Sequence, residues 1–258
     1  MTISVGIIGK GTVGKAVYDG LLYLGHKMSF YDPAYENSFI EDVLNTDCVF
    51  VCVPTDSTET GDCDTSIVTK VASELSSLGY TGLVAIKSTV VPGTSEKLAS
   101  EYPNLRFASV PEFLRAKTAL ADFIHNHDVL VIGVKSDEDF ELVKEIHGAY
   151  PREVARVSPT EAEVVKYFNN VHHAMQVTFA NITYEVCKSL GADYTNVYNA
   201  ITKRTVINPA YLVCNENIRG FGGHCLPKDT KAWNNLIKKQ GLDFSLIQSV
   251  LDDNNKFI

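Results

Sequence analysis

The sequence predicts an α/β fold in which a doubly wound parallel sheet is followed by an all-helical region that begins with one long connecting helix. Three observations predict it. Short apolar runs alternate with amphipathic helical patterns in the first part of the chain, a glycine-rich turn follows the first run, and no further series of strands follows Ser158. We therefore expect two domains, over residues 1–157 and residues 158–258.

Six apolar runs predict buried strands. They span residues 5–8, 28–31, 48–53, 83–86, 106–109 and 129–132. Strands of a parallel sheet are covered on both faces, so they are continuous apolar runs rather than alternating ones. Helical patterns separate most of the runs, which is typical of parallel strands joined by crossover helices.

The turn after the first run has the spacing G-x-G-x-x-G, with glycines at Gly9, Gly11 and Gly14. Gly9 permits the tight turn, Gly11 permits close approach of a pyrophosphate to the backbone, and Gly14 permits close packing of helix on strand. Between a strand and a helix this spacing predicts a Rossmann-type dinucleotide-binding domain. Thr12 and Val13 open the helix and complete the expected cofactor-binding turn.

Asp32 ends the second run, 18 residues beyond Gly14. A carboxylate there accepts hydrogen bonds from both hydroxyls of an adenosine ribose and repels a 2′-phosphate, so the sequence favours NAD over NADP. The alternative is that Asp32, which precedes Pro33, starts a turn and has no cofactor role.

The second region opens with Ser158-Pro159-Thr160-Glu161, a capping box that predicts a helix through about Leu190, where Gly191 ends it. Lys166 and Asn170 are four residues apart and share one face of this helix. A Lys–Asn pair suits the stabilisation of a developing oxyanion, although a solvated helix face is the alternative. Further helices are expected over residues 193–202, 230–240 and 244–255.

The stretch GFGGHCLPKD, residues 220–229, places one thiol between a flexible glycine loop and a helix that we expect to start at Asp229. A helix start favours a thiolate, and Lys228 adds a positive charge. Asp229 could cap the helix or act as a base for a neighbouring hydroxyl. The alternatives are a buried structural Cys225 and a plain N-cap.

This stretch resembles the catalytic-cysteine loop of the UDP-glucose/GDP-mannose dehydrogenase family. Three more stretches resemble the family in the same order: the glycine-rich turn, residues 87–89 with residues 111–115, and residues 161–166 running on to Asn170. The resemblance covers nearly all 258 residues. Family members usually continue into a third domain that binds the nucleotide sugar, and we expect no room for that domain here.

The resemblance implies an NAD-dependent four-electron oxidation of a nucleotide-sugar primary alcohol to the uronate, with UDP-glucose as the expected substrate. Asp229 would take the proton of the alcohol, while Lys166 and Asn170 steady its oxygen. Cys225 would add to the resulting aldehyde, and a second oxidation would leave a thioester. Thr89 and Glu112 would position the water that hydrolyses it.

The resemblance also assigns binding roles. The expected substrate-binding residues, besides Glu112 and Lys166, are Phe113, Leu114, Arg115, Tyr211 and Gly222. Thr55, Thr89 and Lys228 join the glycine turn and Asp32 as cofactor-binding residues. Without the resemblance, Thr89 is equally a turn residue at a strand end and Glu112 a carboxylate at a helix start.

One residue departs from the family pattern. Members usually have PEFLRE, whereas Arg115 is followed here by Ala116. The missing carboxylate leads us to expect that hydrolysis of the thioester lags behind its formation.

Two other functions compete with this one. A two-electron β-hydroxyacid dehydrogenase also joins a Rossmann domain to a long helix with a Lys-x-x-x-Asn pair, but its chemistry does not need Cys225. A non-catalytic NAD-binding partner of a full-length enzyme would need neither Cys225 nor Asp229.

The composition excludes several classes of function. A balance of 23 Lys+Arg against 31 Asp+Glu gives a net charge of −8 without a long basic run, so nucleic acid and anionic membranes are not expected partners. The N-terminus lacks a signal-peptide pattern and no apolar stretch approaches a membrane span, which predicts a cytoplasmic protein.

The six cysteines and seven histidines predict no metal site. Cys48 and Cys52 share one face of a buried strand as small apolar fillers, and no C-x-x-C pair occurs. His125 and His127 fall in an expected surface loop.

The long helix predicts a homodimer. It carries more apolar side chains than a small helical region easily covers, namely Val164, Val165, Val171, Met175, Val177, Phe179 and Ile182.

Overall fold

The structure, a computed structural model, describes residues 2–258 and divides into two compact units. The first runs from the N-terminus to Asp56 and continues over Asp64–Lys166. The second comprises Ser57–Cys63 and Tyr167–Ile258. The functional domains expected over residues 1–157 and 158–258 stay a prediction.

Seven strands form one sheet in the first unit, in the order β2-β1-β3-β4-β5-β6-β7. Their bounds are Ser4–Ile8 (β1), Lys27–Tyr31 (β2), Cys48–Val51 (β3), Leu83–Ile86 (β4), Arg106–Ser109 (β5), Val129–Gly133 (β6) and Glu153–Val157 (β7). The six apolar runs are β1 to β6, so their prediction is confirmed. Strand β7 was not predicted, because its sequence EVARV lies at the sheet edge and is neither continuous nor fully buried.

Strands β1 to β5 are parallel, as predicted for a doubly wound sheet. Strand β6 runs antiparallel to β5, where Ser109 pairs with Gly133, and β7 is parallel to β6. The chain places β2 on one side of β1 and β3 on the other. This reversal of strand order is a point where α/β sheets bind ligands at the carboxyl ends of their strands.

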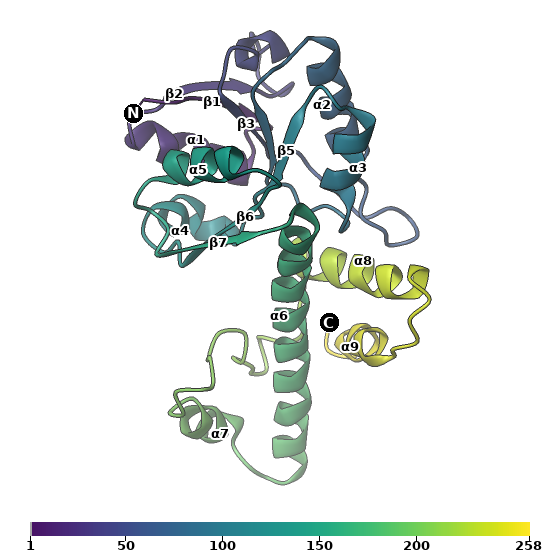
Figure 1. Ribbon diagram of the computed structural model, residues 1–258. Helices are drawn as coiled ribbons and strands as arrows, with labels where there is room; N and C mark the ends of the chain where they lie inside the picture. The colour runs from purple at the N-terminus through teal and green to yellow at the C-terminus, as the bar shows by residue number, and fades with distance from the viewer. Residues whose placement is uncertain (1) are drawn as a thin grey trace. The chain divides into compact units, whose positions relative to one another are not determined.

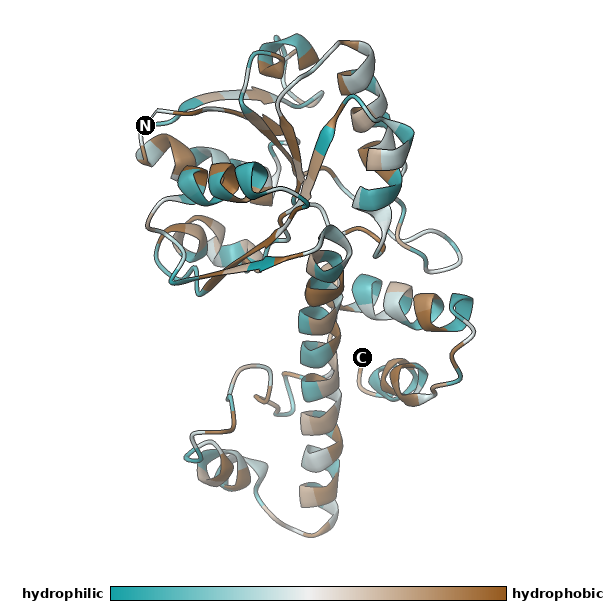
Figure 2. Cartoon of the chain, viewed as in Figure 1, coloured by the Kyte–Doolittle hydropathy of each residue, from teal (hydrophilic) through white to brown (hydrophobic). Residues whose placement is uncertain are grey.

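Helices cover both faces of the sheet (Figure 1). Their bounds are Thr12–Tyr23 (α1), Ser66–Ser77 (α2), Thr94–Glu101 (α3), Ala119–Ile124 (α4) and Asp137–His147 (α5), with single 3-10 turns at Ile40–Val43 (η1) and Ala116–Thr118 (η2). On one face α1, α4 and α5 enclose a core with Leu21 and Phe123, and on the other α2 and α3 enclose a core with Leu75 and Leu98. Figure 2 shows the apolar strands between these layers.

The glycine turn between β1 and α1 depends on missing side chains. Gly9 has φ of +88°, which favours glycine. A Cβ on Gly14 would meet the Gly9 carbonyl oxygen at 1.9 Å, whereas a Cβ on Gly11 would meet nothing within 4 Å. Gly14 is therefore required for packing, and Gly11 leaves open space beside the helix start.

Helix α6, Pro159–Ser189, begins in the first unit and continues into the second, where three more helices follow it in sequence. They are Tyr194–Ile201 (α7), Cys225–Lys239 (α8) and Leu246–Asn254 (α9). The predicted capping box is confirmed, because the Glu161 amide donates to Ser158 Oγ and the Ser158 amide donates to Glu161 Oε2. Gly191 has φ of +68° and ends the helix.

The start of α8 differs from the prediction. We expected the helix to begin at Asp229, but it begins at Cys225. Pro227 falls in the first turn, where backbone N–H groups have no partner within the helix, so it does not interrupt the helix. Asp229 therefore lies in the second turn and is not an N-cap.

Two buried asparagines hold the glycine loop that precedes α8. Asn254 of α9 accepts the Phe221 N–H at 2.6 Å and donates to the Phe221 carbonyl at 2.9 Å. Asn181 of α6 accepts the Gly220 N–H at 3.1 Å. The Phe221 ring is 3% exposed and packs with Ala174 and Val250. The loop is thereby fixed by its backbone from two helices.

The segment Ser57–Cys63 belongs to the second unit because it packs on α8. Asn235 donates to the Thr60 carbonyl at 2.8 Å, and Lys239 pairs with Asp62 at 2.8 Å. These contacts join a segment that follows β3 in sequence to the helix that begins at Cys225.

We expect Gly14→Ala to lower the free energy of unfolding by about 1–3 kcal/mol, because its methyl group would overlap the Gly9 carbonyl. Gly11→Ala is the matched control. Gly11→Ala should lower the free energy of unfolding by less than about 1 kcal/mol, the loss typical of a glycine-to-alanine change at a helix N-cap. It should nevertheless weaken NAD binding, because its methyl group would fill the open space beside the helix start. Urea denaturation and titration with NAD measure the two effects. Equal losses of stability would contradict the steric assignment.

We expect Asn254→Ala to lower the free energy of unfolding by about 2–3 kcal/mol, because it leaves both backbone groups of Phe221 without their partner. Asn234→Ala is the control, since Asn234 is equally buried but donates to Gln248 and does not bond the loop; it should cost about 1 kcal/mol. Hydrogen exchange should accelerate at residues 220–224 in the first variant and not in the second. Unchanged exchange in both would show that the loop does not depend on Asn254.

Candidate functional site

The carboxyl edge of the parallel strands gathers the predicted site residues of the first unit. The glycine turn follows β1, Asp32 follows β2, Thr55 follows β3, Thr89 follows β4 and Glu112 follows β5. Because β1 to β5 are parallel, these positions share one edge of the sheet.

The start of α1 suits a bound diphosphate. Its N-cap is Gly11, which supplies no side chain, and the first turn of the helix carries no acidic residue. The first N–H groups of the helix and the space beside Gly11 are therefore available to an anion. Thr12 and Val13 contribute two of these first-turn groups.

Asp32 is held in place by backbone donors. Its Oδ2 accepts the Lys10 N–H at 2.6 Å and its Oδ1 accepts the Ala34 N–H at 2.9 Å. The second bond makes the turn that was the alternative interpretation of Asp32, but each oxygen retains a lone pair for a further donor. The Lys10 ammonium lies over the rings of Tyr18 and Phe30.

A buried ion pair lies just below this edge. Lys87 Nζ is 3.1 Å from Glu112 Oε2, and the two side chains are 1% and 7% exposed. The Phe113 N–H donates to Glu112 Oε1 at 2.8 Å, so each carboxylate oxygen has a donor. Thr89, two residues after Lys87, is half-buried. Lys87 was not predicted as a site residue, although a lysine directly after a buried apolar strand was a signal for it.

Burial would raise the pKa of Glu112, but the Lys87 ammonium, His127 and the Phe113 amide together lower it below its usual value. Glu112 is therefore a carboxylate at neutral pH. His127 is 7% exposed, so its assignment to a surface loop was wrong. It packs against Phe123 of α4 and His147 of α5, which cover it from solvent.

Lys166 lies at the end of the first unit. Its ammonium donates to the Glu112 carbonyl oxygen and lies 5.4 Å from the centre of the Phe113 ring. It is half-buried, and Asn170 is 5% exposed, so the alternative of a solvated helix face does not hold. The structure thus brings Lys166 together with the Glu112–Phe113 backbone.

Arg115 makes a paired contact with an aspartate of α4. Its Nε and Nη2 donate to Asp122 at 2.9 and 2.6 Å, and its own amide donates there at 3.1 Å. This guanidinium lowers the pKa of Asp122 well below its usual range. Leu114 is half-buried, and Ala116 is exposed at the start of η2. Asp122 was not predicted from the sequence.

In the second unit, Asp229 lies at the centre of a buried polar cluster. It is 1% exposed and its Oδ2 accepts the Asn170 amide at 2.6 Å, while its Oδ1 accepts the Lys228 ammonium at 2.6 Å. Asn169 donates to Asn170 Oδ1 at 2.9 Å, which fixes the orientation of that amide. The structure thus brings together three of the predicted residues, Asn170, Lys228 and Asp229.

Cys225 is the first residue of α8 and lies one helical turn before Asp229. It is a free thiol and exposed, whereas the other five cysteines of the described chain are buried or half-buried. At a helix start the thiol faces unpaired N–H groups and the positive end of the helix dipole.

The two remaining predicted residues lie in the loops before α8. Tyr211 has φ of +66° and its ring stacks on His173 of α6 with centroids 3.9 Å apart. Gly222 is exposed, and a Cβ there would meet nothing within 4 Å. Gly222 therefore leaves open space beside the loop, whereas the Tyr211 ring is held against α6.

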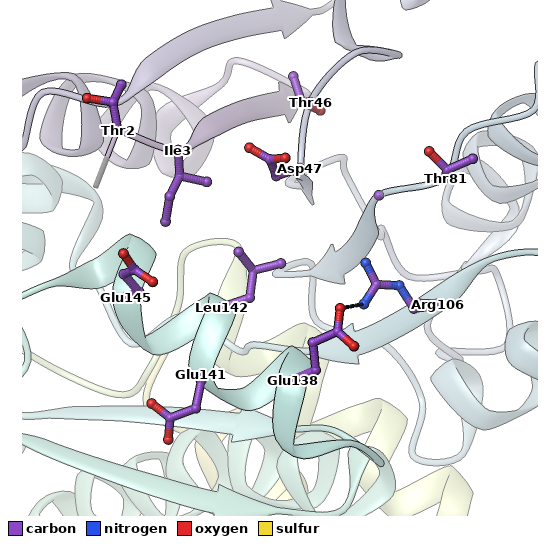
Figure 3. A pocket seen from close by; sticks show the side chains of 11 residues that line it. Thr2, Ile3, Thr46, Asp47, Thr81, Arg106, Glu138, Glu141, Leu142 and Glu145 are labelled. Atoms are coloured by element: carbon purple, nitrogen blue, oxygen red, sulfur yellow. Dashed lines mark hydrogen bonds and ion pairs between the residues drawn. The ribbon is translucent and has the colours of Figure 1, made fainter.

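A pocket of about 580 Å³ lies at the opposite, amino-terminal edge of the sheet (Figure 3). Asp47, Glu138, Glu141 and Glu145 line it with Arg106, which bonds Glu138. Clustered carboxylates repel phosphates, so this pocket does not suit a dinucleotide. Within the described residues 2–258, no helix is long and apolar enough to cross a membrane.

The chain matches two family models. Residues 33–150 match the NAD binding domain of the UDP-glucose/GDP-mannose dehydrogenase family, and residues 160–256 match the central domain of the same family.

Individual relatives agree with these matches. A UDP-glucose 6-dehydrogenase of Rickettsia bellii is 29% identical over 98% of this chain and 67% of its own length. One from Haloferax volcanii is 33% identical over 83% of this chain and 54% of its own length. The chain thus spans between about half and two thirds of these relatives.

A solved structure of a UDP-glucose dehydrogenase from Pyrobaculum islandicum has a TM-score of 0.89 and 30% identity, over 99% of this chain and 68% of that one. The similarity therefore extends through both units and agrees with both family models. This chain belongs to the UDP-glucose/GDP-mannose dehydrogenase family of oxidoreductases, and NAD is the cofactor of its N-terminal domain.

Proposed function

We propose that this chain catalyses the NAD-dependent four-electron oxidation of a nucleotide-sugar primary alcohol to the uronate, with UDP-glucose as the preferred substrate. The observation that carries this proposal is the exposed Cys225 thiol at the first residue of α8, one turn before the buried Asp229. The reaction of a two-electron β-hydroxyacid dehydrogenase does not need this thiol. A non-catalytic partner needs neither the Cys225 thiol nor the Asp229 carboxylate.

NAD supplies the hydride acceptor for both oxidations. In the first, Asp229 takes the hydroxyl proton of the alcohol, directly or through water, as its carbon loses a hydride. The Asn170 amide and the Lys166 ammonium stabilise the oxygen, which carries developing negative charge. The product of this step is an aldehyde.

In the second oxidation the Cys225 thiolate adds to the aldehyde carbon and forms a thiohemiacetal. Loss of a second hydride gives a thioester, and water then attacks its carbonyl carbon as the C–S bond breaks. Thr89 and Glu112 position this water. One alcohol, two NAD and one water give one carboxylate, two NADH and three protons.

The binding roles extend the same proposal. The glycine turn holds the diphosphate of NAD, Asp32 binds the adenosine ribose and excludes a 2′-phosphate, and Thr55, Thr89 and Lys228 complete the cofactor site. The substrate contacts are proposed for the segment 112–115 with Phe113, Leu114 and Arg115, and for Tyr211 and Gly222.

We assign the cofactor to a domain over residues 1–157, and the catalytic thiol and dimerisation to a domain over residues 158–258. We place the protein in the cytoplasm, because the exposed free thiol of Cys225 suits a reducing compartment.

The yield of NADH per sugar tests the reaction. We expect two equivalents of NADH for each UDP-glucose consumed, and Cys225→Ser should reduce uronate formation roughly 10⁴-fold or more, because a serine hydroxyl is a poor nucleophile at neutral pH. Cys63→Ser is the control and should retain two equivalents. One equivalent would support the two-electron alternative, and none with any nucleotide sugar would support a non-catalytic partner.

We further propose that the protein forms a homodimer through α6. Along this helix Phe168, Phe179, Ile182 and Val186 are 70%, 67%, 40% and 49% exposed. With the exposed His172 and the half-buried Met175, they recur at alternating spacings of four and three residues, the pattern of a helix–helix seam. A second copy presents an identical seam and so covers it.

A charge on this seam should prevent dimerisation. We expect Phe179→Glu to convert the protein to a monomer at micromolar concentration, because the carboxylate would be buried without a partner. Lys97→Gln, on the exposed surface of α3, also changes the net charge by −1 and should leave the dimer intact. Light scattering measures both masses. A wild-type protein that is already monomeric would refute the seam.

A further inference from the structure

Lys87 is a buried cation with an uncommon environment. The whole residue is 3% exposed, and its ammonium lies 5.3 and 5.9 Å from the centres of the Phe50 and Phe123 rings. Burying a cation among aromatic rings is costly unless a buried anion compensates it. Glu112, 3.1 Å away, is that anion.

The pairing also fixes the direction of the Glu112 carboxylate. Lys87 donates to Glu112 Oε2, the Phe113 amide donates to Glu112 Oε1, and Lys166 donates to the Glu112 backbone carbonyl. The carboxylate therefore cannot rotate without breaking two hydrogen bonds. Its remaining lone pairs point in set directions, as an acceptor that orients a water must have.

Two histidines and a cysteine beside the pair are uncharged at neutral pH. Burial and the Lys87 charge lower the pKa of His127, and the same two causes lower the pKa of His147 well below its usual value. His147 Nδ1 lies 2.8 Å from the Val143 carbonyl, and its Nε2 has no hydrogen-bond partner among the described residues, which suits a neutral ring. Burial raises the pKa of Cys52 to about 12. Among residues 2–258, the cations in contact with Glu112 are Lys87 and, at its backbone carbonyl, Lys166.

We propose that Lys87 is a positioning residue for the hydrolytic half-reaction, because it keeps Glu112 ionised and oriented as the acceptor for the attacking water. The proposal rests on the proposed function. As water attacks the thioester, a C–O bond forms, the C–S bond breaks, the thiolate returns to Cys225, and the water proton passes to Glu112 and then to solvent. Lys87 is 3% exposed, so in this proposal it acts through Glu112 and not by direct contact with substrate.

Lys87→Met tests the role by its pH dependence. Without the ammonium, burial raises the pKa of Glu112, so the carboxyl is protonated at neutral pH and ionises only as the pH rises. In rapid mixing with UDP-glucose and NAD, we expect a burst of two NADH per active site as in the wild type. The steady rate at pH 7 should fall roughly a hundredfold, the scale of a lost acid–base contribution, and recover in part by pH 9.

Matched variants separate this role from simple destabilisation. Lys87→Arg keeps the charge and should retain the steady rate to within about tenfold. The double variant Lys87→Met with Glu112→Gln removes both buried charges, so it should fold even if Lys87→Met does not, and should show the slow steady rate without recovery at high pH. Lys135→Met loses a surface lysine paired with Glu96 and should behave as the wild type. Loss of burst and steady rate together, or a slow rate with no pH dependence in Lys87→Met, would overturn the proposal.

A measurement without turnover distinguishes this proposal from the proposed function. Infrared spectra of protein labelled with ¹³C at glutamate carboxyls, with the Glu112→Gln spectrum subtracted, report the protonation of Glu112 alone. We expect an ionised carboxylate at pH 7 in the wild type and a protonated carboxyl in Lys87→Met. Identical titrations would refute the role of Lys87 even if the enzyme is active, and the absence of NADH formation in the wild type would refute the proposed function instead.

Discussion

The continuous helix α6 constrains both units, because its 31 residues contribute side chains to each of them. Near its start Glu163, 2% exposed, accepts the amides of Gly93 and Ser95, which ties the helix to the first turn of α3. Lys166 follows three residues later on the same face and donates to the Glu112 carbonyl. A helix anchored at Glu163 therefore has little freedom to move Lys166 away from the backbone that carries the buried carboxylate.

Farther along, the same helix fixes both sides of the reactive thiol. Asn170 holds Asp229, and Asn181 holds the Gly220 amide. Their separation of eleven residues is close to three helical turns, so the two amides project from one face of α6. One rigid element thus positions the loop before Cys225 and the carboxylate after it. The thiol itself has no such anchor and remains exposed, which an attacking nucleophile requires.

The sequence predicted those parts of the fold and site whose signals are local. Strands β1 to β6 were recognisable because burial on both faces leaves continuous apolar runs, whereas β7 lies at an edge, contains charged residues and has no such run. Gly9 was predicted from the spacing of the glycine turn, and the roles of Glu112 and Cys225 from short stretches that resemble the family. The contacts that orient them were not found. Lys87 meets Glu112 across 25 residues and Asn254 meets Phe221 across 33, and no periodicity or spacing specifies a contact at such separations.

The ion pair of Arg115 shows which carboxylate lies beside this arginine when position 116 is an alanine. In the family pattern a carboxylate directly follows the arginine, and here that position is an exposed alanine. The arginine is nevertheless paired, because Asp122 of α4 binds its guanidinium through two hydrogen bonds and its amide through a third. The Asp122 carboxylate is therefore still present beside Arg115. It is hydrogen-bonded to the guanidinium, which lowers the pKa of Asp122, so this carboxylate is a weak acceptor for a water proton. In the proposed reaction, the carboxylate that the segment 111–115 contributes to hydrolysis is then Glu112, which is paired with Lys87.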